Sequence, residues 1–135
     1  MSSPHIFIAE DDPDVRTSIA EILRDEGYDT SEFSRLGDAL RELRAGARPC
    51  VVLIDHLMPG MSGLEFIDAL RSDARLRDIR VVIITGAKMD AAEFEILRKP
   101  FDVEDLVAVV ARHCPHAAPR ADESGSEPRD HVEFN

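Results

Sequence analysis

The sequence lacks any apolar run long enough to cross a bilayer, and Met1 to Pro4 contain neither a basic start nor an apolar signal segment. We therefore expect a cytoplasmic protein with no membrane partner. Cysteine is scarce: Cys50 opens a predicted buried strand and Cys114 ends a predicted helix. We expect two free thiols, because disulfides are rare in a reducing compartment, and neither cysteine has the neighbours that a zinc site needs.

Basic residues are few relative to acidic ones, with 16 Lys and Arg against 27 Asp and Glu and a net charge of −11. Because nucleic acids are bound through concentrated positive charge, this balance argues against nucleic acid as a direct partner. An EF-hand loop, a Walker loop and a Gly-x-Gly-x-x-Gly motif are also missing. The length of 135 residues and the hydrophobic content of 44% suit one globular domain with a real core.

Short apolar segments alternate with segments of helical periodicity along most of the chain. Strands are predicted at 5–9, 28–33, 50–54, 81–84 and 95–99. Helices are predicted after the first, second, third and fifth of these. The segment 28–33 is more polar than the others, so we expect it near an edge. Strands that alternate with helices predict a parallel α/β sheet covered by helices on both faces.

The periodic pattern stops after Cys114, where Pro, Ala, Ser, Gly, Glu and Arg dominate. Such a composition cannot bury enough apolar surface to offset the entropy of ordering. We therefore expect a domain over 1–114 and a disordered acidic tail over 115–135. A partner-binding motif within 131–134 is an alternative, but a solvated extension is favoured.

Side chains that could bind a metal or take part in catalysis follow the ends of the predicted strands. They are Glu10 and Asp11 after the first strand, Asp55 after the third, Thr85 after the fourth and Lys99 after the fifth. In open α/β sheets, ligands bind outside the carboxyl ends of the strands. A few carboxylates with room for water suit Mg²⁺. Together with the metal, Thr85 and Lys99 could neutralise a phosphoryl group in transfer to Asp55, which predicts an aspartyl phosphate.

Taken together, these positions resemble the receiver domain of two-component response regulators. The resemblance covers about residues 5–113 and rests on an ordered set: Glu10-Asp11, Asp55 followed by Met58-Pro59-Gly60 and Gly63, Thr85-Gly86, and Lys99-Pro100-Phe101. It implies a flavodoxin-like, doubly wound, five-stranded parallel sheet of order 2-1-3-4-5. It also implies a stand-alone signalling protein rather than an enzyme, which catalyses only its own phosphorylation and dephosphorylation.

The resemblance further implies partners and a metal site. The phosphoryl donor would be a phosphohistidine of a sensor histidine kinase or a histidine phosphotransfer protein, and the output would be contact with a downstream protein target. Asp11 would bind Mg²⁺ directly and Glu10 through water, while Asp55 would lend a carboxylate oxygen and Leu57 its backbone carbonyl. Asp12 is expected to cap the helix that follows.

The segment between Thr85 and Lys99 departs from the family pattern. It is several residues shorter than usual, so the fourth helix is expected to be short or absent. Ile96 stands where the family usually has Tyr or Phe, which suggests that residues 86–94 signal by a change from disorder to order. Leu57 and Ala87 cannot orient a water molecule through a side chain, so we expect slow self-dephosphorylation.

Several alternatives remain beside this interpretation. Acidic residues at 10–12 could simply favour a helix N-terminus. His56 should point away from its neighbour Asp55, because adjacent side chains of an extended segment alternate. The Asp-x-Asp-x-Thr motif of haloacid dehalogenases is not matched, because after Asp12 and Asp14 the threonine, Thr17, comes one place too late. Any other hydrolase would lack a water-activating base. The main rival is a receiver-fold interaction module that no longer switches on phosphorylation.

Overall fold

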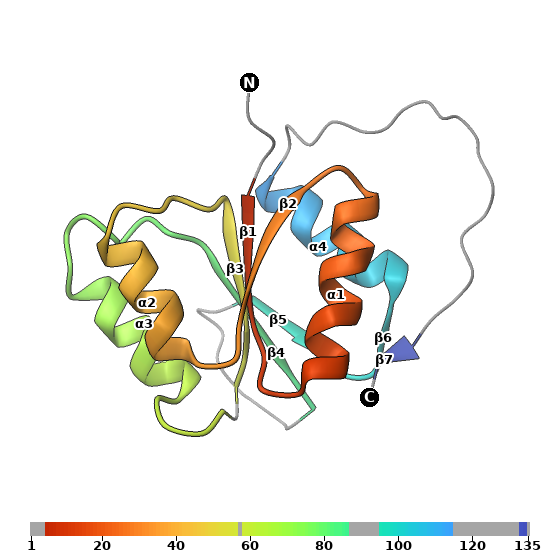
Figure 1. Ribbon diagram of the computed structural model, residues 1–135, viewed down its shortest axis with the longest axis horizontal. Coiled ribbons are helices and arrows are strands. Elements are labelled where there is room, and N and C mark those ends of the chain that lie inside the picture. The colour runs from red at the N-terminus through yellow and green to blue at the C-terminus, as the bar shows by residue number, and fades with distance from the viewer. Residues whose placement is uncertain (1–4, 57, 87–94, 115–132, 135) are drawn as a thin grey trace.

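The computed structural model describes residues 5–56, 58–86, 95–114 and 133–134. Its main element is a parallel sheet with the strand order β2-β1-β3-β4-β5, which confirms the predicted topology (Figure 1). The strands are β1 (His5–Ala9), β2 (Asp29–Phe33), β3 (Val51–Asp55), β4 (Val81–Thr85) and β5 (Glu95–Arg98). The polar strand β2 lies at an edge, as expected. None of the helices in these ranges is long and apolar enough to span a membrane.

Helices cover both faces of the sheet, as predicted. They are α1 (Pro13–Asp25), α2 (Leu36–Arg44), α3 (Gly63–Arg71) and α4 (Val103–His113). Helices α2 and α3 lie on one face, and α1 and α4 on the other (Figure 1). The side chains of each strand alternate between two apolar clusters, one under each pair of helices. Because both faces are covered, the central strands β1, β3 and β4 are apolar along their lengths, apart from His5 at the start of β1 and Asp55 and Thr85 at the ends of β3 and β4.

Local sequence signals fix where the helices begin. The Asp12 side chain accepts hydrogen bonds from the N–H groups of Asp14 and Val15, and Pro13 takes the first helical position, so the predicted capping role of Asp12 is confirmed. Asp102 and Asp105 form a reciprocal capping box at the start of α4. The caps start α1 and α4 a few residues after β1 and β5 end, so Glu10, Asp11 and Lys99 lie in short connections between a strand and a capped helix.

The prediction of two free thiols is wrong. Cys50 and Cys114 form a disulfide, with their Cα atoms 5.7 Å apart. The reason is topological. Helix α4 runs back from the carboxyl ends of the strands toward their amino ends (Figure 1). Cys114 directly follows α4 and bonds there to Cys50, the residue before β3. The prediction rested on the usual redox compartment of such a chain, which carries no information about which residues the fold brings together.

A second, smaller sheet joins β6 (Phe101–Asp102) to β7 (Glu133–Phe134) in antiparallel orientation. Two residues of the segment expected to be disordered therefore form a strand instead. For residues 115–132 and 135, which the structure does not describe, the tail prediction stays a prediction. The expected shortening of the fourth helix falls on residues 87–94, which also lie outside the described residues.

Candidate functional site

Three carboxylates converge where β1 and β3 end. Each of Glu10, Asp11 and Asp55 offers one oxygen, and these oxygens lie within 4.8 Å of one another. The sheet register explains the convergence, because Ala9 is paired with Ile54, so that the two strands end level. The structure thus brings together three of the four predicted metal ligands. The fourth, Leu57, lies outside the described residues.

Glu10 has an unusual environment for a carboxylate, since it is only 3% exposed. Its Oε2 accepts a hydrogen bond from the Asp12 N–H at 3.1 Å, whereas its buried Oε1 has no hydrogen-bond partner among the described residues. Burial raises the pKa of Glu10 to about 7, and the nearby charge of Asp55 adds to this rise. A buried carboxylate oxygen without a donor is a position where a cation would be stabilised.

The donor set fits a magnesium ion. All three side chains offer oxygen, the ligand atom that Mg²⁺ prefers, and a small number of carboxylates leaves coordination positions for water or a phosphoryl oxygen. Glu10 is buried, Asp55 half-buried and Asp11 exposed, so the cluster opens toward solvent on the side of Asp11. A closed Ca²⁺ cage would need six to eight oxygen ligands.

Lys99, which follows the edge strand β5, reaches the same cluster. Its Nζ lies 3.7 Å from Oε1 of Glu10, and this ammonium group is largely buried. Its backbone N–H donates to the carbonyl of Thr85 at 2.9 Å, which ties the end of β5 to the end of β4. Thr85 is 2% exposed and comes one residue after Ile84, the partner of Asp55 in the register. All the predicted catalytic residues therefore lie at the carboxyl ends of the parallel strands.

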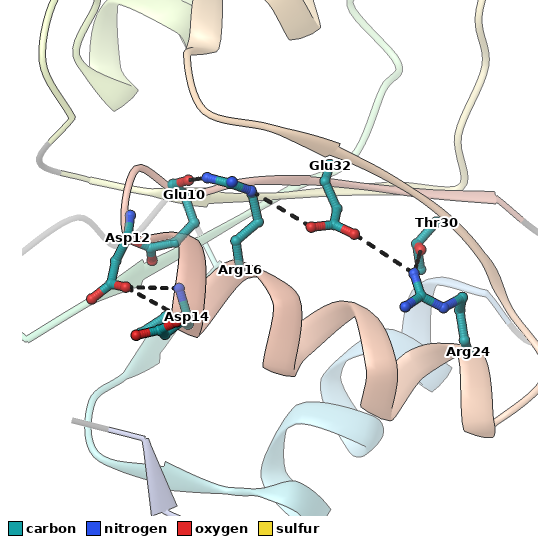
Figure 2. Close-up of polar contacts among 8 residues, drawn as sticks. Glu10, Asp12, Asp14, Arg16, Arg24, Thr30 and Glu32 are labelled. Atoms are coloured by element: carbon teal, nitrogen blue, oxygen red, sulfur yellow. Dashed lines mark hydrogen bonds and ion pairs between the residues drawn. The ribbon is translucent and has the colours of Figure 1, made fainter.

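Arg16 is a residue of this region that sequence reasoning missed. Its guanidinium donates to the backbone carbonyl of Glu10 at 2.7 Å and pairs with Glu32 of β2 at 3.6 Å (Figure 2). Glu32 in turn pairs with Arg24 at 3.6 Å. These contacts hold the backbone of Glu10 to α1 and β2. One signal existed: a cation near a helix N-terminus opposes the helix dipole and so needs a local partner.

His56, the neighbour of Asp55, packs beneath the start of α3. The backbone N–H of His56 donates to the carbonyl of Ile84 at 3.1 Å. The buried ring nitrogen Nδ1 has no hydrogen-bond partner in the described part of the chain. A Cβ added at Gly63 would lie 3.6 Å from this Nδ1. The imidazole therefore fills space next to Gly63, and the carboxylate cluster does not include it.

Known proteins resemble this chain in sequence. The family model described as the response regulator receiver domain matches residues 6–111. The DNA-binding response regulator MtrA of Mycolicibacterium smegmatis is 32% identical in a 114-position alignment that covers 78% of this chain and 48% of that protein. The chain spans about half the length of the first curated relatives it matches.

Solved structures share the fold. A response regulator receiver domain protein (CheY-like) from Methanospirillum hungatei JF-1 is 28% identical, with a TM-score of 0.73 over 84% of this chain and 95% of that one. The response regulator TrrA from Thermotoga maritima, in complex with Mg(2+)-BeF, is 25% identical, with a TM-score of 0.71 over 81% of this chain and 97% of that one.

Proposed function

Because this chain belongs to the response regulator receiver domain family, we propose that it is a phosphorelay receiver in which Asp55 accepts a phosphoryl group from a phosphohistidine. The observation that carries the proposal is the convergence of Asp55, the acidic pair Glu10 and Asp11, and the ammonium group of Lys99 at one edge of the sheet. A carboxylate nucleophile, a cation site and a fixed positive charge are the parts that phosphoryl transfer needs.

In the proposed reaction, a carboxylate oxygen of Asp55 attacks the phosphorus atom of the donor. The bond between phosphorus and the donor imidazole breaks, the imidazole nitrogen leaves with the electron pair, and an acyl phosphate forms on Asp55. Glu10, Asp11, Asp55 and the Leu57 carbonyl would hold Mg²⁺, whose charge offsets that of the phosphoryl oxygens. Lys99 would neutralise a second phosphoryl oxygen, and the Thr85 hydroxyl would donate to a third.

The partners that suit this chemistry are a sensor histidine kinase or a histidine phosphotransfer protein as donor, and a downstream protein as target. We propose that the protein signals by protein contact, catalyses only its own phosphorylation and dephosphorylation, and works in the cytoplasm. Ile96, at the position where the family usually has an aromatic residue, is half-buried against the core under α2 and α3. The proposed order change in 86–94 and the role of Ala87 fall on residues outside or bordering the described ranges.

Intact-mass measurement tests the proposal. The protein is incubated with Mg²⁺ and either acetyl phosphate or a phosphorylated histidine phosphotransfer protein. We expect the wild type to gain the mass of one phosphoryl group, and D55N to gain none. The matched control D29N alters an exposed carboxylate at the amino end of β2, whereas Asp55 lies at the carboxyl end of β3, and should behave as the wild type. No gain from either donor would overturn the proposal in favour of an interaction module that does not switch.

A further inference from the structure

Strand β6 is short and has a single strand partner in the described ranges, the C-terminal strand β7. The register pairs Phe101 with Phe134 and Asp102 with Glu133. The two strands lie side by side at the N-terminal end of α4, on the side of the molecule where the parallel strands end (Figure 1). The last residues of the chain thus meet the connection between β5 and α4.

This connection also carries Lys99. From Lys99, whose N–H donates to the Thr85 carbonyl at 2.9 Å, the chain passes through Pro100 directly into β6. Phe101 is 2% exposed and packs into the apolar cluster under α1 and α4, and Asp102 caps α4. A partner strand on β6 therefore restrains a segment that is anchored at both ends and begins two residues from the proposed catalytic lysine.

The pairing lies within one chain, and the chain length allows it. Helix α4 carries the chain away from β6 by about 16 Å, at 1.5 Å for each residue of Val103–His113. The return path is residues 115–132, which could extend over about 60 Å at most. The connection is therefore long enough to return to β6 without displacing α4, and the tether keeps the local concentration of β7 high.

The pairing is also small, with two residues in each strand. Isolated two-stranded pairs are marginally stable in water, so the pairing depends on the tether and can open without loss of the main sheet. A contact of this kind suits a reversible restraint better than a permanent part of the core.

We propose that the edge of β6 is a docking surface for the C-terminal strand of this same chain, and that docked β7 restrains the Lys99 segment and, by holding the lysine charge in place, speeds phosphoryl acceptance at Asp55. The effect on phosphorylation rests on the proposed function, whereas the docking and the restraint do not.

The test compares the full-length wild type with E133P/F134P. Proline has no N–H, so the double substitution removes every N–H donor of β7, whichever one faces β6. The matched control is A117P/A118P, which adds two prolines to the tail outside β7. We expect cross-strand NOEs between the backbones of β6 and β7 in the wild type and in the control, and none in E133P/F134P. A sample mixing labelled and unlabelled chains separates pairing in cis from pairing with a second copy.

Two further measurements follow from the restraint. The Lys99 amide should exchange with solvent at least threefold faster in E133P/F134P than in the control. The initial rate of phosphorylation by acetyl phosphate should fall twofold to fivefold in E133P/F134P relative to the control. Missing wild-type NOEs, or NOEs between labelled and unlabelled chains only, would overturn the docking in cis. Unchanged Lys99 exchange would overturn the restraint, and an unchanged phosphorylation rate would overturn the effect on Asp55. If no variant takes a phosphoryl group, the proposed function and the rate effect fail together, while the NOEs and Lys99 exchange still decide docking and restraint.

Discussion

Nζ of Lys99 lies 3.7 Å from Oε1 of Glu10, so the end of β5 is joined to the end of β1 by an ion pair whose carboxylate is almost fully buried. The positive charge of the lysine therefore lies next to a carboxylate that would also hold a metal cation. It therefore has two opposite effects at the proposed site: it assists a phosphoryl group and competes with Mg²⁺ for the negative charge of Glu10.

The first prediction separates these two effects with K99Q. We expect phosphorylation to slow by about tenfold or more, because a preorganised positive charge is lost. Mg²⁺ affinity should instead increase by about threefold, because a competing cation is removed. Isothermal titration measures the affinity and intact mass the rate. K99R keeps the charge and should bind Mg²⁺ much as the wild type does, whereas weaker Mg²⁺ binding by K99Q would contradict the competition.

The second prediction concerns the Cys50–Cys114 disulfide. It joins residues 64 positions apart, and a loop of that length is expected to stabilise the folded state by about 4 kcal/mol through the entropy of the unfolded chain. Dithiothreitol should therefore lower the free energy of unfolding of the wild type by about that amount in a urea titration, and should leave C50S unchanged. Because Cys50 precedes β3 and Asp55 ends it, C50S should keep the phosphorylation rate of the wild type. An equal response of both proteins to the reductant would argue against the bridge.

The third prediction uses two glycines in similar positions near helix starts. A Cβ at Gly63 would lie 3.3 Å from Cδ1 of Ile54, a fully buried side chain, and 3.5 Å from Cα of His56. G63A should therefore lower the free energy of unfolding by about 1–2 kcal/mol. A Cβ at Gly37 in α2 meets nothing within 4 Å, so G37A should raise it by about 0.5–1 kcal/mol through higher helix propensity. Urea unfolding measures both, and the same sign for the two variants would refute the packing argument.

The fourth prediction concerns acid stability where Glu95, at the start of β5, meets the end of α4. Burial raises the pKa of Glu95, but hydrogen bonds from Arg112 and His113 outweigh it, and the pKa lies below its usual range. A carboxylate with a lowered pKa stabilises the fold above its unfolded pKa, and this stability is lost as the pH falls through the folded pKa. E95Q should thus lose less stability than the wild type between pH 5 and pH 3. Urea titrations at several pH values measure this, with E21Q on α1 as the control; parallel curves for E95Q and the wild type would count against it.

Much of the fold could be predicted from the sequence because its signals are local. Apolar runs marked the central strands, Asp12 marked the start of α1, and the alternation of strands with helices marked a parallel sheet. The candidate site followed from the same logic, since residues that end neighbouring parallel strands meet at one edge. That is why Glu10, Asp55 and Lys99 could be grouped although they lie far apart in the chain.

Other features depend on pairs of residues that no local pattern connects. The ion pair of Arg16 with Glu32, the disulfide of Cys50 with Cys114 and the pairing of β6 with β7 each join segments that are distant in the chain. The compositional argument that predicted free thiols and a disordered tail considered each segment alone. It could not include the direction in which α4 returns across the sheet.

The sequence by itself determined the class of fold, the order of the chemical groups and the edge of the sheet at which they gather, because periodicity and strand ends are written locally in the chain. Only the tertiary structure decided that Glu10 is buried and forms an ion pair with Lys99, that the two cysteines bond, and that β7 returns to β6. These outcomes depend on distances between elements, which follow from packing and crossover direction and leave no trace in any single segment.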